Sequence, residues 1–527
     1  MAMPRQWWRG GVVYQVYPRS FADSDGDGVG DLAGITERLN YLEWLGIEAI
    51  WLNPTMPSPN SDWGYDVADY CDVHPELGSL ADLDRLVQEA RGRGIAVVLD
   101  LVPNHTSDQH AWFDESRSER DSPRRDWYVW RDGAPDGSPP NNWRSIFGGP
   151  AWTLDERTGQ HYLHNFLPAQ PDLNWWSDEV RVAFDEILRF WLDRGIAGFR
   201  IDVAHGIVKD RELRDNPPAR TEDPEEVHRL GQRPVYNFNR PEVHDVLRRW
   251  RSLANDHARP GVLIGETWAP DLAALARFYG EEADELHLAF NFFFTVSSFD
   301  AGELQRVVED TETAFGQAAW PAWTLSNHDV VRFPTRWCGG DGRKTPCALM
   351  LLLTLRGTPF LYYGDELGLP QTPVPEASVR DPVGRDGART PMQWSPEDGA
   401  GFTRSGVEPW LPFGDPAACN VEGQRREPGS ALHLCRDLIG LRASSADLRE
   451  GNYELLQAPS GAWVFRRGSG TVVALNLSDS GVRIEGLDGV IRVGTRRERE
   501  GEEARDLDLA PWEGVVVSAS SDRPILP

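Results

Sequence analysis

Residues 95–103 read IAVVLDLVP, a short run of aliphatic residues that follows a helical pattern, SLADLDRLVQEARGRG, at 79–94. Similar apolar, β-branched runs recur at 12–18, 47–54, 197–202, 262–266, 286–292, 322–327 and 359–366. Amphipathic helical patterns lie between most of them. Continuous hydrophobic strands that alternate with helices indicate a parallel sheet covered by helices. Eight such repeats predict an α/β fold, a closed (β/α)8 TIM barrel.

Three long intervals interrupt this alternation, and all three follow strands. The first, 104–174, is rich in Pro, Gly, Asn and Trp and is too long for a simple loop, so it predicts an inserted lobe over the barrel mouth. The others, 207–240 and 370–415, emerge at the same C-terminal face of the barrel. Alternating strands with turns begin near residue 448. We therefore expect a catalytic barrel at 1–103 and 175–447, a lobe at 104–174 and a C-terminal antiparallel β-sandwich domain at 448–527.

The composition excludes several classes of function. The chain has 527 residues, with 82 Asp and Glu against 54 Lys and Arg, and its formal net charge of -28 repels nucleic acid and anionic membrane surfaces. The five cysteines show no CxxC spacing, which fits neither a disulfide framework nor a zinc site. The first residues lack the apolar core of a signal peptide, so we expect a cytoplasmic protein with no membrane partner.

Three acids stand where predicted strands end: Asp202 in GFRIDVAHG, Glu266 in LIGETW and Asp329 in SNHDVVR. They are too far apart in sequence to share a helix, but barrel closure would bring them to one mouth. A pair of carboxyl groups about 5 to 5.5 Å apart suits glycoside hydrolysis with retention. Arg200, on the same strand face as Asp202, is expected to keep that nucleophile ionised by charge pairing. Burial near Trp268 and neighbouring negative charge are expected to leave Glu266 protonated.

The segments GGVVYQVYPRSF, DLVPNHTS, QPDLNW, GFRIDVAHG, GETW and SNHDVVR, from residue 10 to about 410, resemble the α-amylase superfamily, glycoside hydrolase family 13. QPDLNW at 170–175 is typical of its oligo-1,6-glucosidase and α-glucosidase branch. The resemblance implies that Asp202 is the nucleophile, that Glu266 is the general acid/base, and that Asp329 binds ring hydroxyls and distorts the sugar.

The same resemblance implies a set of substrate-binding residues. Tyr65 would stack under the terminal glucose, and Asp66 would bind its 4-hydroxyl, which would make the enzyme exo-acting. Either Arg385 or Arg389 would be the partner of this aspartate. Other candidates are Arg200, His105 and His328, which match subsite residues, and Phe147 and Phe166, which would line the pocket or belong to the lobe core. A single histidine in a loop is more often structural, so the two histidines remain the weaker candidates.

Residues 23–31, DSDGDGVGD, place Asp23, Asp25, Asp27 and the carbonyl of Val29 at ligand positions 1, 3, 5 and 7 of a calcium loop. Position 12 is Gly34 instead of glutamate, and a strand precedes the loop, so this is not an EF-hand. The resemblance implies a structural Ca²⁺ or Mg²⁺ held by Asp23, Asp25, Asp27, Val29 and Asp31. A metal-free turn is the alternative, and no organic cofactor is expected.

We expect a retaining, exo-acting α-glucosidase that releases α-glucose from the non-reducing end of short maltose- or isomaltose-type α-glucosides through a covalent glucosyl-enzyme, with transglucosylation as a further option. In the branch that this chain resembles, Val directly after the nucleophile accompanies α-1,6 cleavage, and Thr there accompanies a preference for α-1,4 bonds. The resemblance therefore implies that Val203 favours tolerance of α-1,6 bonds, but Ala204 and His205 depart from the α-1,6-specific members, so the linkage stays open. The alternatives are a trehalose synthase or another glucosyl isomerase, and a non-catalytic sugar-binding or transporter-associated relative. A non-catalytic relative would have lost the carboxylates. The oligomeric state is not indicated.

Overall fold

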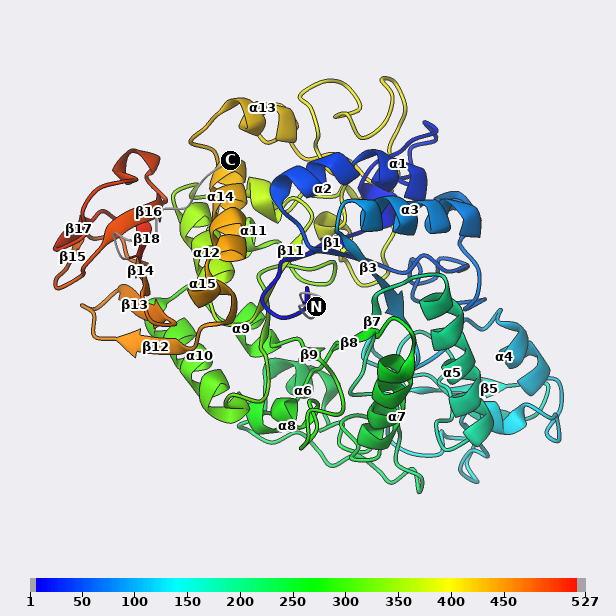
Figure 1. Ribbon diagram of the computed structural model, residues 1–527. Helices are drawn as coiled ribbons and strands as arrows, with labels where there is room; N and C mark the ends of the chain where they lie inside the picture. Colours follow the sequence, from blue (N-terminus) through cyan, green and yellow to red (C-terminus); the bar gives the residue numbers. More distant parts are fainter. Residues whose placement is uncertain (1–5, 519–527) are drawn as a thin grey trace.

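The computed structural model describes residues 6–518, the side chain of Glu226 excepted, and its centre is a parallel eight-stranded sheet (Figure 1). The strands are β1 (Val13–Val16), β2 (Ala49–Leu52), β3 (Ala96–Leu101), β7 (Gly198–Ile201), β8 (Val262–Gly265), β9 (Leu288–Ala289), β10 (Ala322–Thr324) and β11 (Thr358–Tyr362). They are paired in the order β10-β11-β1-β2-β3-β7-β8-β9. A parallel bridge between Phe290 and Ala322 links the two ends. The predicted (β/α)8 barrel is confirmed.

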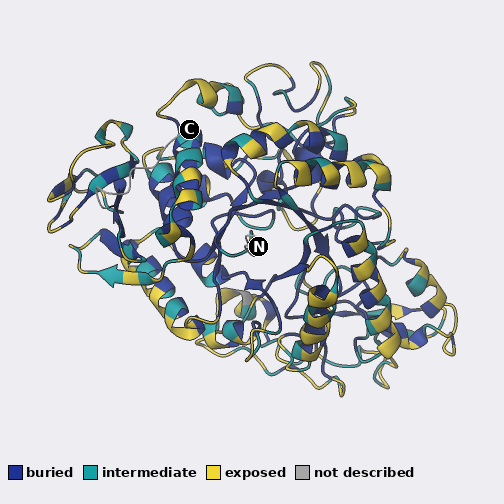
Figure 2. Cartoon of the chain, viewed as in Figure 1, coloured by how far each residue is buried: buried dark blue, intermediate teal, exposed yellow. Residues whose placement is uncertain are grey.

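Helices form the outer layer of the barrel, with buried inner faces and exposed outer faces (Figure 2). They are α1 (Leu32–Glu37), α2 (Leu39–Leu45), α3 (Leu80–Gly92), α5 (Asp178–Asp193), α7 (Val243–Asp256), α8 (Leu272–Arg277), α9 (Phe292–Val296), α10 (Ala301–Phe315), α11 (Phe333–Arg336), α12 (Lys344–Thr354), α13 (Val421–Arg426), α14 (Ala431–Ser444) and α15 (Ala446–Glu450). Local sequence sets their starts. In α3, for example, Ser79 and Asp82 form a reciprocal capping box that satisfies free backbone N–H groups.

Strand register decides which side chains enter the barrel. Asp100 on β3 is paired with Arg200 on β7, which is paired with Ile264 on β8. Paired residues of neighbouring strands point to the same face. Ile264 belongs to an apolar cluster with Val13, Ala49, Trp51, Val98, Leu288, Phe290 and Phe360, which come from the inner faces of the strands. Asp100 and Arg200 therefore lie inside the barrel at the point where these apolar side chains end.

The expected insertion follows β3. It contains α4 (Ala111–Ser116) and a three-stranded antiparallel sheet of order β4-β6-β5, formed by β4 (Trp130–Arg131), β5 (Trp152–Asp155) and β6 (Gln160–Leu163). Trp143, Ala151, Trp152 and Leu163 form its small apolar cluster. The interval after β7 contains α6 (Glu225–Leu230). The boundaries at 104 and 174 remain predictions.

The expected C-terminal antiparallel sheet is also present, with strands β12 (Tyr453–Leu456), β13 (Ala462–Arg467), β14 (Thr471–Asn476), β18 (Gly514–Ser518) and β16 (Val490–Gly494) paired in that order. A second, two-stranded sheet pairs β15 (Val482–Ile484) with β17 (Leu507–Leu509). One face of the larger sheet joins the barrel core through Trp463 and Phe465. The other face packs on residues of the smaller sheet, including Ile484 and Leu507. Residues 1–5 and 519–527 of the predicted domains lie outside the described residues.

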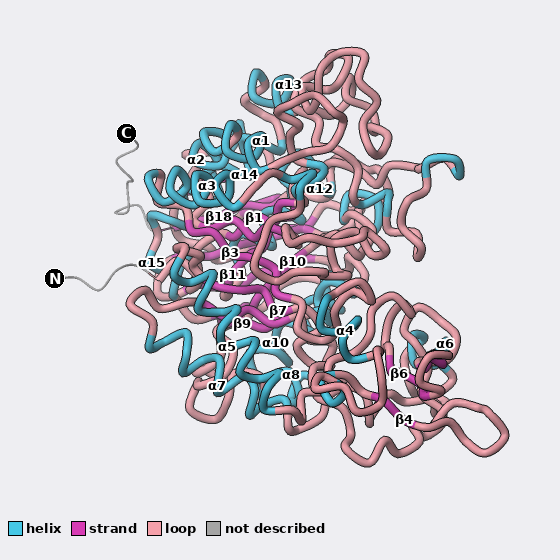
Figure 3. Tube along the Cα trace, turned by 90° about the vertical axis from the view of Figure 1, so that its right-hand side faces the viewer, coloured by secondary structure: helices cyan, strands magenta, loops and turns pink. Residues whose placement is uncertain are grey.

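Long loops gather at one end of the barrel, beside the sheet of β4 and β6 (Figure 3). This is the end at which the strands finish and where barrel enzymes place their reacting groups. Within residues 6–518, no helix has both the length and the apolar character needed to span a membrane.

Candidate active site

Three carboxylates follow barrel strands at the mouth, as predicted. Asp202 comes directly after β7, Glu266 directly after β8, and Asp329 five residues after β10. Asp202 and Glu266 are both buried. β7 and β8 are neighbours, and the bridge between Phe290 and Ala322 closes the sheet next to β10, so acids more than sixty positions apart in sequence come to one mouth.

Arg200 joins two of these acids. Its Nη1 donates to Asp202 Oδ1 and to Asp100 Oδ1, both at 2.7 Å, and its Nη2 donates to Glu266 Oε2 at 2.8 Å. The guanidinium is 2% exposed, so these charge-assisted bonds act in a medium of low polarity. The predicted pairing of Arg200 with Asp202 is thus present. Asp100 was not among the predicted site residues, although an acid inside an aliphatic run signals a buried partner.

The protonation of this cluster differs from the expectation. Burial raises the pKa of Asp202 well above its ordinary value, the charges of Glu266, Asp100 and Asp329 raise it further, and Arg200 acts against them. Burial also raises the pKa of Asp100 to about 6, although Arg200 opposes it. One guanidinium shared among three acids does not outweigh their desolvation and mutual repulsion. The expected charge pairing with Arg200 is present, but it does not hold the pKa of Asp202 below its ordinary value.

Asp329 has the opposite environment. Its Oδ1 accepts bonds from Arg385 Nη1 and Arg389 Nη2, each at 3.1 Å. Burial acts to raise the pKa of Asp329, but the contact with the neighbouring His328 and the charges of Arg385, Arg389 and Arg200 hold it below its ordinary value. Both arginines that the sequence left open therefore contact the third acid, which remains a carboxylate across the working range of pH.

The predicted aromatic and imidazole groups surround the same acids. Tyr65 lies parallel to the His328 ring, with centroids 5.2 Å apart, and its hydroxyl donates to Asp100 Oδ2 at 3.0 Å. His328 Nε2 lies 3.2 Å from Asp329 Oδ2, and its Nδ1 lies 2.9 Å from the amide of Gln15. Burial lowers the pKa of His328 well below its ordinary value, so the ring is neutral.

His105 lies at the lobe side of the mouth. Its Nε2 is 3.0 Å from the carbonyl of Tyr65 and 3.0 Å from the amide of Gln170. Burial lowers the pKa of His105, so this ring is also neutral. Gln170 is in the QPDLNW segment, and its amide also donates to Asp62 Oδ2 at 3.0 Å. The lobe is thus connected to the loop after β2 by the side-chain amide of Gln170 and the ring of His105.

Asp66 does not face either arginine. Its carboxylate is 0% exposed and accepts bonds from Ser58 Oγ at 2.7 Å and from the backbone N–H groups of Ser61 and Asp62 at 2.8 and 2.9 Å. These bonds hold the Asp66 carboxylate against its own loop, residues 58–66. The acid that forms an ion pair with Arg385 is Asp62, four residues earlier. The predicted pairing of Asp66 with Arg385 or Arg389 is therefore wrong, because the turn at 60–65 directs Asp62 to the mouth and Asp66 inward.

Phe147 and Phe166 belong to the mouth as well as to the lobe. Their rings are 5.5 Å apart, and both are half-buried. The Arg385 guanidinium lies 5.4 Å from the Phe147 ring, and the His105 ring lies 5.2 Å from the Phe166 ring. Phe147 therefore lies against a guanidinium that contacts Asp329, and Phe166 lies against a ring that contacts the carbonyl of Tyr65.

Two residues beside the acids have unusual conformations or exposure. Val203 has a φ of 45°, a left-handed conformation that is strained for a β-branched residue. Its N–H donates to Glu266 Oε2 at 2.9 Å. Trp268 is 41% exposed, and its indole N–H donates to Glu266 Oε1 at 3.1 Å. Glu266 thus accepts three hydrogen bonds, one of them from the predicted neighbour Trp268.

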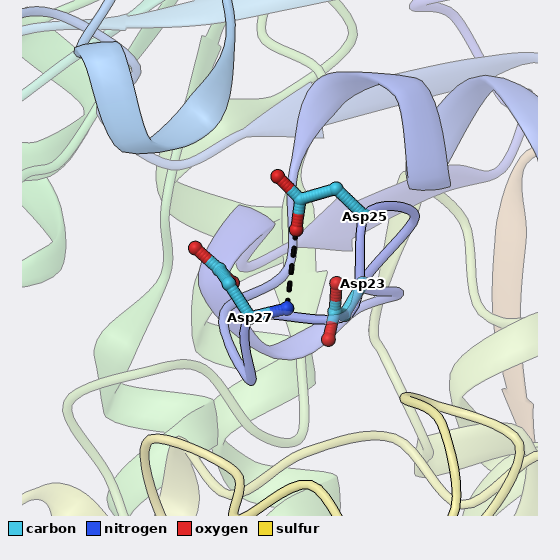
Figure 4. Close-up of side chains that lie close together, drawn as sticks. All are labelled: Asp23, Asp25 and Asp27. Carbon is cyan, nitrogen blue, oxygen red and sulfur yellow. Dashed lines mark hydrogen bonds between the residues drawn. The ribbon is translucent and has the colours of Figure 1, made fainter.

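The acidic loop between β1 and α1 gathers three of its five predicted ligands. Asp23, Asp25 and Asp27 each offer an oxygen, and these oxygens lie within 4.8 Å of one another (Figure 4). Burial raises the pKa of Asp25, and the charges of Asp27, Asp23 and Asp31 raise it further. Crowded carboxylate oxygens suit a hard cation such as Ca²⁺ or Mg²⁺. Asp31 instead caps α1 through Gly34 N at 2.7 Å, and the carbonyl of Val29 stays a predicted ligand.

Comparisons with known proteins agree with this geometry. Residues 15–451 match the family model described as alpha amylase, catalytic domain. The chain is 41% identical to a probable alpha-glucosidase of Rhizobium meliloti (92% of this chain, 93% of that protein) and 36% identical to an oligo-1,6-glucosidase of Heyndrickxia coagulans (92% and 94%). A crystal structure of XgtA, an alpha-glucosyl transfer enzyme, is 39% identical and superposes with a TM-score of 0.91, covering 98% of this chain and all of that one. This chain therefore belongs to the α-amylase family of glycoside hydrolases, family 13, and is an α-glucosidase-like enzyme within it.

Proposed function

We propose that the enzyme is a retaining, exo-acting α-glucosidase that acts on short α-glucosides. The observation that carries the proposal is the bridging of Asp202 and Glu266 by one buried guanidinium, that of Arg200. Two carboxyl groups held on one arginine are close enough for a nucleophile and an acid/base to act on the same glycosidic bond. A sugar-binding protein would have no use for this arrangement.

The reaction follows from the roles of these two acids. Asp202 Oδ1 is held by Arg200, so we assign attack on the anomeric carbon to Oδ2. The bond from that carbon to the leaving oxygen breaks, and Glu266 gives its proton to that oxygen. A water molecule then attacks the same carbon, Glu266 takes the proton of the water, and the bond to Asp202 breaks. Two inversions at one carbon release glucose as the α anomer.

Exo action is supported by the ion pair of Asp62 with Arg385. Arg385 also bonds Asp329 at 3.1 Å and has Phe147 against its guanidinium. A loop after β2, the segment after β11 and the lobe therefore meet at one side of the acids. We infer that this junction binds the hydroxyls of the terminal glucose and leaves no path for a longer chain on that side.

The glycosidic linkage that the enzyme cleaves and the acceptor of the glucosyl group are further parts of the proposal. Val203 supports tolerance of α-1,6 bonds beside α-1,4 bonds. Transfer of glucose to a sugar is the second candidate activity, because XgtA, with which this chain shares 39% identity over its full length, is an alpha-glucosyl transfer enzyme. In transfer, a sugar hydroxyl replaces water in the second step, and the rest of the chemistry is unchanged.

We further propose that the loop of Asp23, Asp25 and Asp27 holds a structural divalent cation. The loop is bonded to the segment after β11: Asp23 N donates to Phe402 O at 2.9 Å, and Trp410 N donates to Gly28 O at 2.9 Å. A cation would offset the repulsion of the acids and so hold both segments. It would stabilise the fold without taking part in the reaction.

The test is glucose release from maltose, isomaltose, sucrose and trehalose, with the product anomers followed by NMR. We expect α-glucose as the first product from maltose or isomaltose. β-Glucose as the first product would overturn retention. Conversion of sucrose or trehalose to an isomer with little free glucose would instead identify a glucosyl isomerase.

A further inference from the structure

The side chain of Trp268 is exposed, yet contacts on several sides hold it in one position. It is the only exposed tryptophan among the residues that the structure describes, and one face of its ring lies flat on Phe292, with centroids 4.2 Å apart and planes 10° apart. Its main chain is bonded on both sides: its N–H lies 3.4 Å from His205 Nδ1, and its carbonyl accepts from Asn239 Nδ2 at 3.1 Å. The side chain is therefore held in place although it faces solvent.

The hydrogen bonds on Glu266 are unequally divided between its two oxygens. Oε2 accepts from Arg200 Nη2 at 2.8 Å and from Val203 N at 2.9 Å, which occupies both of its lone pairs. Oε1 accepts from the Trp268 indole at 3.1 Å. One lone pair of Oε1 is left, so this oxygen is the one able to carry a proton.

We propose that Trp268 is a positioning residue for the acid/base, whose indole N–H fixes Oε1 of Glu266 in the orientation from which the proton reaches the leaving oxygen. The inference rests on the proposed function and names a residue that acts through Glu266. In the second step the same N–H stabilises the carboxylate that has given its proton away. The indole would thus act in both halves of the reaction without touching the reacting carbon.

Other charged and titratable groups also face Glu266. A substitution of Trp268 leaves all of them unchanged. Arg200, Asp202 and Asp100 approach it from the barrel interior, and the His205 ring lies against its carbonyl, with Nδ1 at 3.3 Å. Replacing Trp268 by phenylalanine removes one N–H and keeps a ring of similar shape over Phe292. Any change in proton transfer is then assigned to that N–H.

The experiment compares Trp268→Phe with wild type on two α-glucosides. Maltose has a poor leaving group that needs a proton, whereas 4-nitrophenyl α-glucoside has a leaving group that needs almost none. Because general acid catalysis contributes about 10²–10⁴-fold, misdirecting the proton should lower kcat/KM for maltose by roughly tenfold. For the nitrophenyl glucoside we expect less than about twofold, since the acid contributes little to that reaction.

The pH profile is the second readout. Without the N–H donor the proton is harder to remove from Glu266, so the alkaline limb of kcat/KM should move to higher pH. Trp176→Phe is the matched control, because that indole N–H donates to the carbonyl of Lys209 at 2.9 Å instead of to an acid. Trp176→Phe should change neither the ratio of kcat/KM for the two substrates nor the position of the alkaline limb.

Two results would overturn the inference. Equal losses on both substrates with an unmoved alkaline limb would mean that the ring only packs on Phe292, and unchanged kinetics would mean that the N–H does nothing. Wild-type activity on maltose is measured in the same series and tests the proposed function separately. A wild type that hydrolyses maltose together with an unaltered Trp268→Phe variant would reject this inference and leave the proposed function standing.

Discussion

Arg385, in the segment after β11, forms an ion pair with Asp62, in the loop after β2. These loops are more than three hundred residues apart, and their charges meet beside Asp329, which Arg385 also contacts. Asp62 and Asp66 lie in the same loop, but only Asp62 pairs with Arg385. Asp62 faces the acids of the mouth, whereas Asp66 is fully buried in the loop itself.

The two acids should respond differently to substitution. Asp62→Asn should lower kcat/KM for maltose by about a hundredfold, since charge-assisted bonds are worth about 1.5–3 kcal/mol, with little change in Tm. Asp66→Asn is its matched control and should reduce the free energy of unfolding by about 1–3 kcal/mol, because it disturbs a buried acceptor of three hydrogen bonds. Steady-state kinetics and thermal unfolding of both variants decide the matter; the reverse pattern would assign sugar binding to Asp66.

Asp202→Asn should lower turnover by at least about a thousandfold, because the amide cannot form the ester with glucose. Asp84→Asn, on the exposed side of α3 and paired with Arg194 at 2.8 Å, should keep wild-type activity. Mass spectrometry of wild type with 5-fluoro-α-glucosyl fluoride should show a glucosyl adduct on the peptide that contains Asp202. An adduct on another peptide would refute the assignment of the nucleophile.

The raised pKa of Asp202 sets the acidic limb of the pH profile. The nucleophile reacts only when ionised, so activity is present above this pKa and is lost as the pH falls through it. Asp100→Asn removes a negative charge that raises the pKa, so the acidic limb of kcat/KM should move to lower pH. Asp84→Asn is again the control and should leave the limb in place. A shift of the limb to higher pH in Asp100→Asn would show that the orientation of Arg200 matters more than the charge.

Removal of divalent cations should lower thermal stability. If a cation binds the folded loop at about a hundred times its Kd, it contributes about 2.7 kcal/mol, so EDTA should lower Tm by several degrees and Ca²⁺ or Mg²⁺ should restore it. Asp25→Ala should start from the lower Tm and should not respond to either treatment. An equal response to EDTA in wild type and Asp25→Ala would place the cation elsewhere.

Val203→Thr should shift the linkage preference. Threonine keeps the β-branched shape at a φ of 45° and adds one hydroxyl donor beside Glu266, so folding should change little. We expect the ratio of kcat/KM for isomaltose to that for maltose to fall by roughly fivefold, as one hydrogen bond of about 1 kcal/mol implies. Val203→Ala provides the comparison for the loss of bulk alone. A ratio that stays constant in Val203→Thr would remove this position from the choice of linkage.

Local pattern was sufficient for the fold and for the positions of the catalytic acids. Each buried strand shows as an aliphatic run, and a residue directly after such a run must lie at the mouth of a closed barrel. The pattern predicts Asp202 and Glu266 directly after such runs and Asp329 a few residues after another. It does not single out Asp100, because this acid lies inside an aliphatic run and therefore inside the predicted strand.

The sequence by itself determined the barrel, the inserted and C-terminal sheets and the three acids at the strand ends, because these depend on hydrophobic periodicity, which is local. Only the tertiary structure decided which charges meet. The packing of separate loops decides that Arg385 pairs with Asp62 instead of Asp66, that three acids share Arg200, and that Trp268 contacts Glu266. The raised pKa of Asp202 depends on burial and on repulsion among groups from four strands. Such interactions act across space, so residues far apart in sequence determine them together.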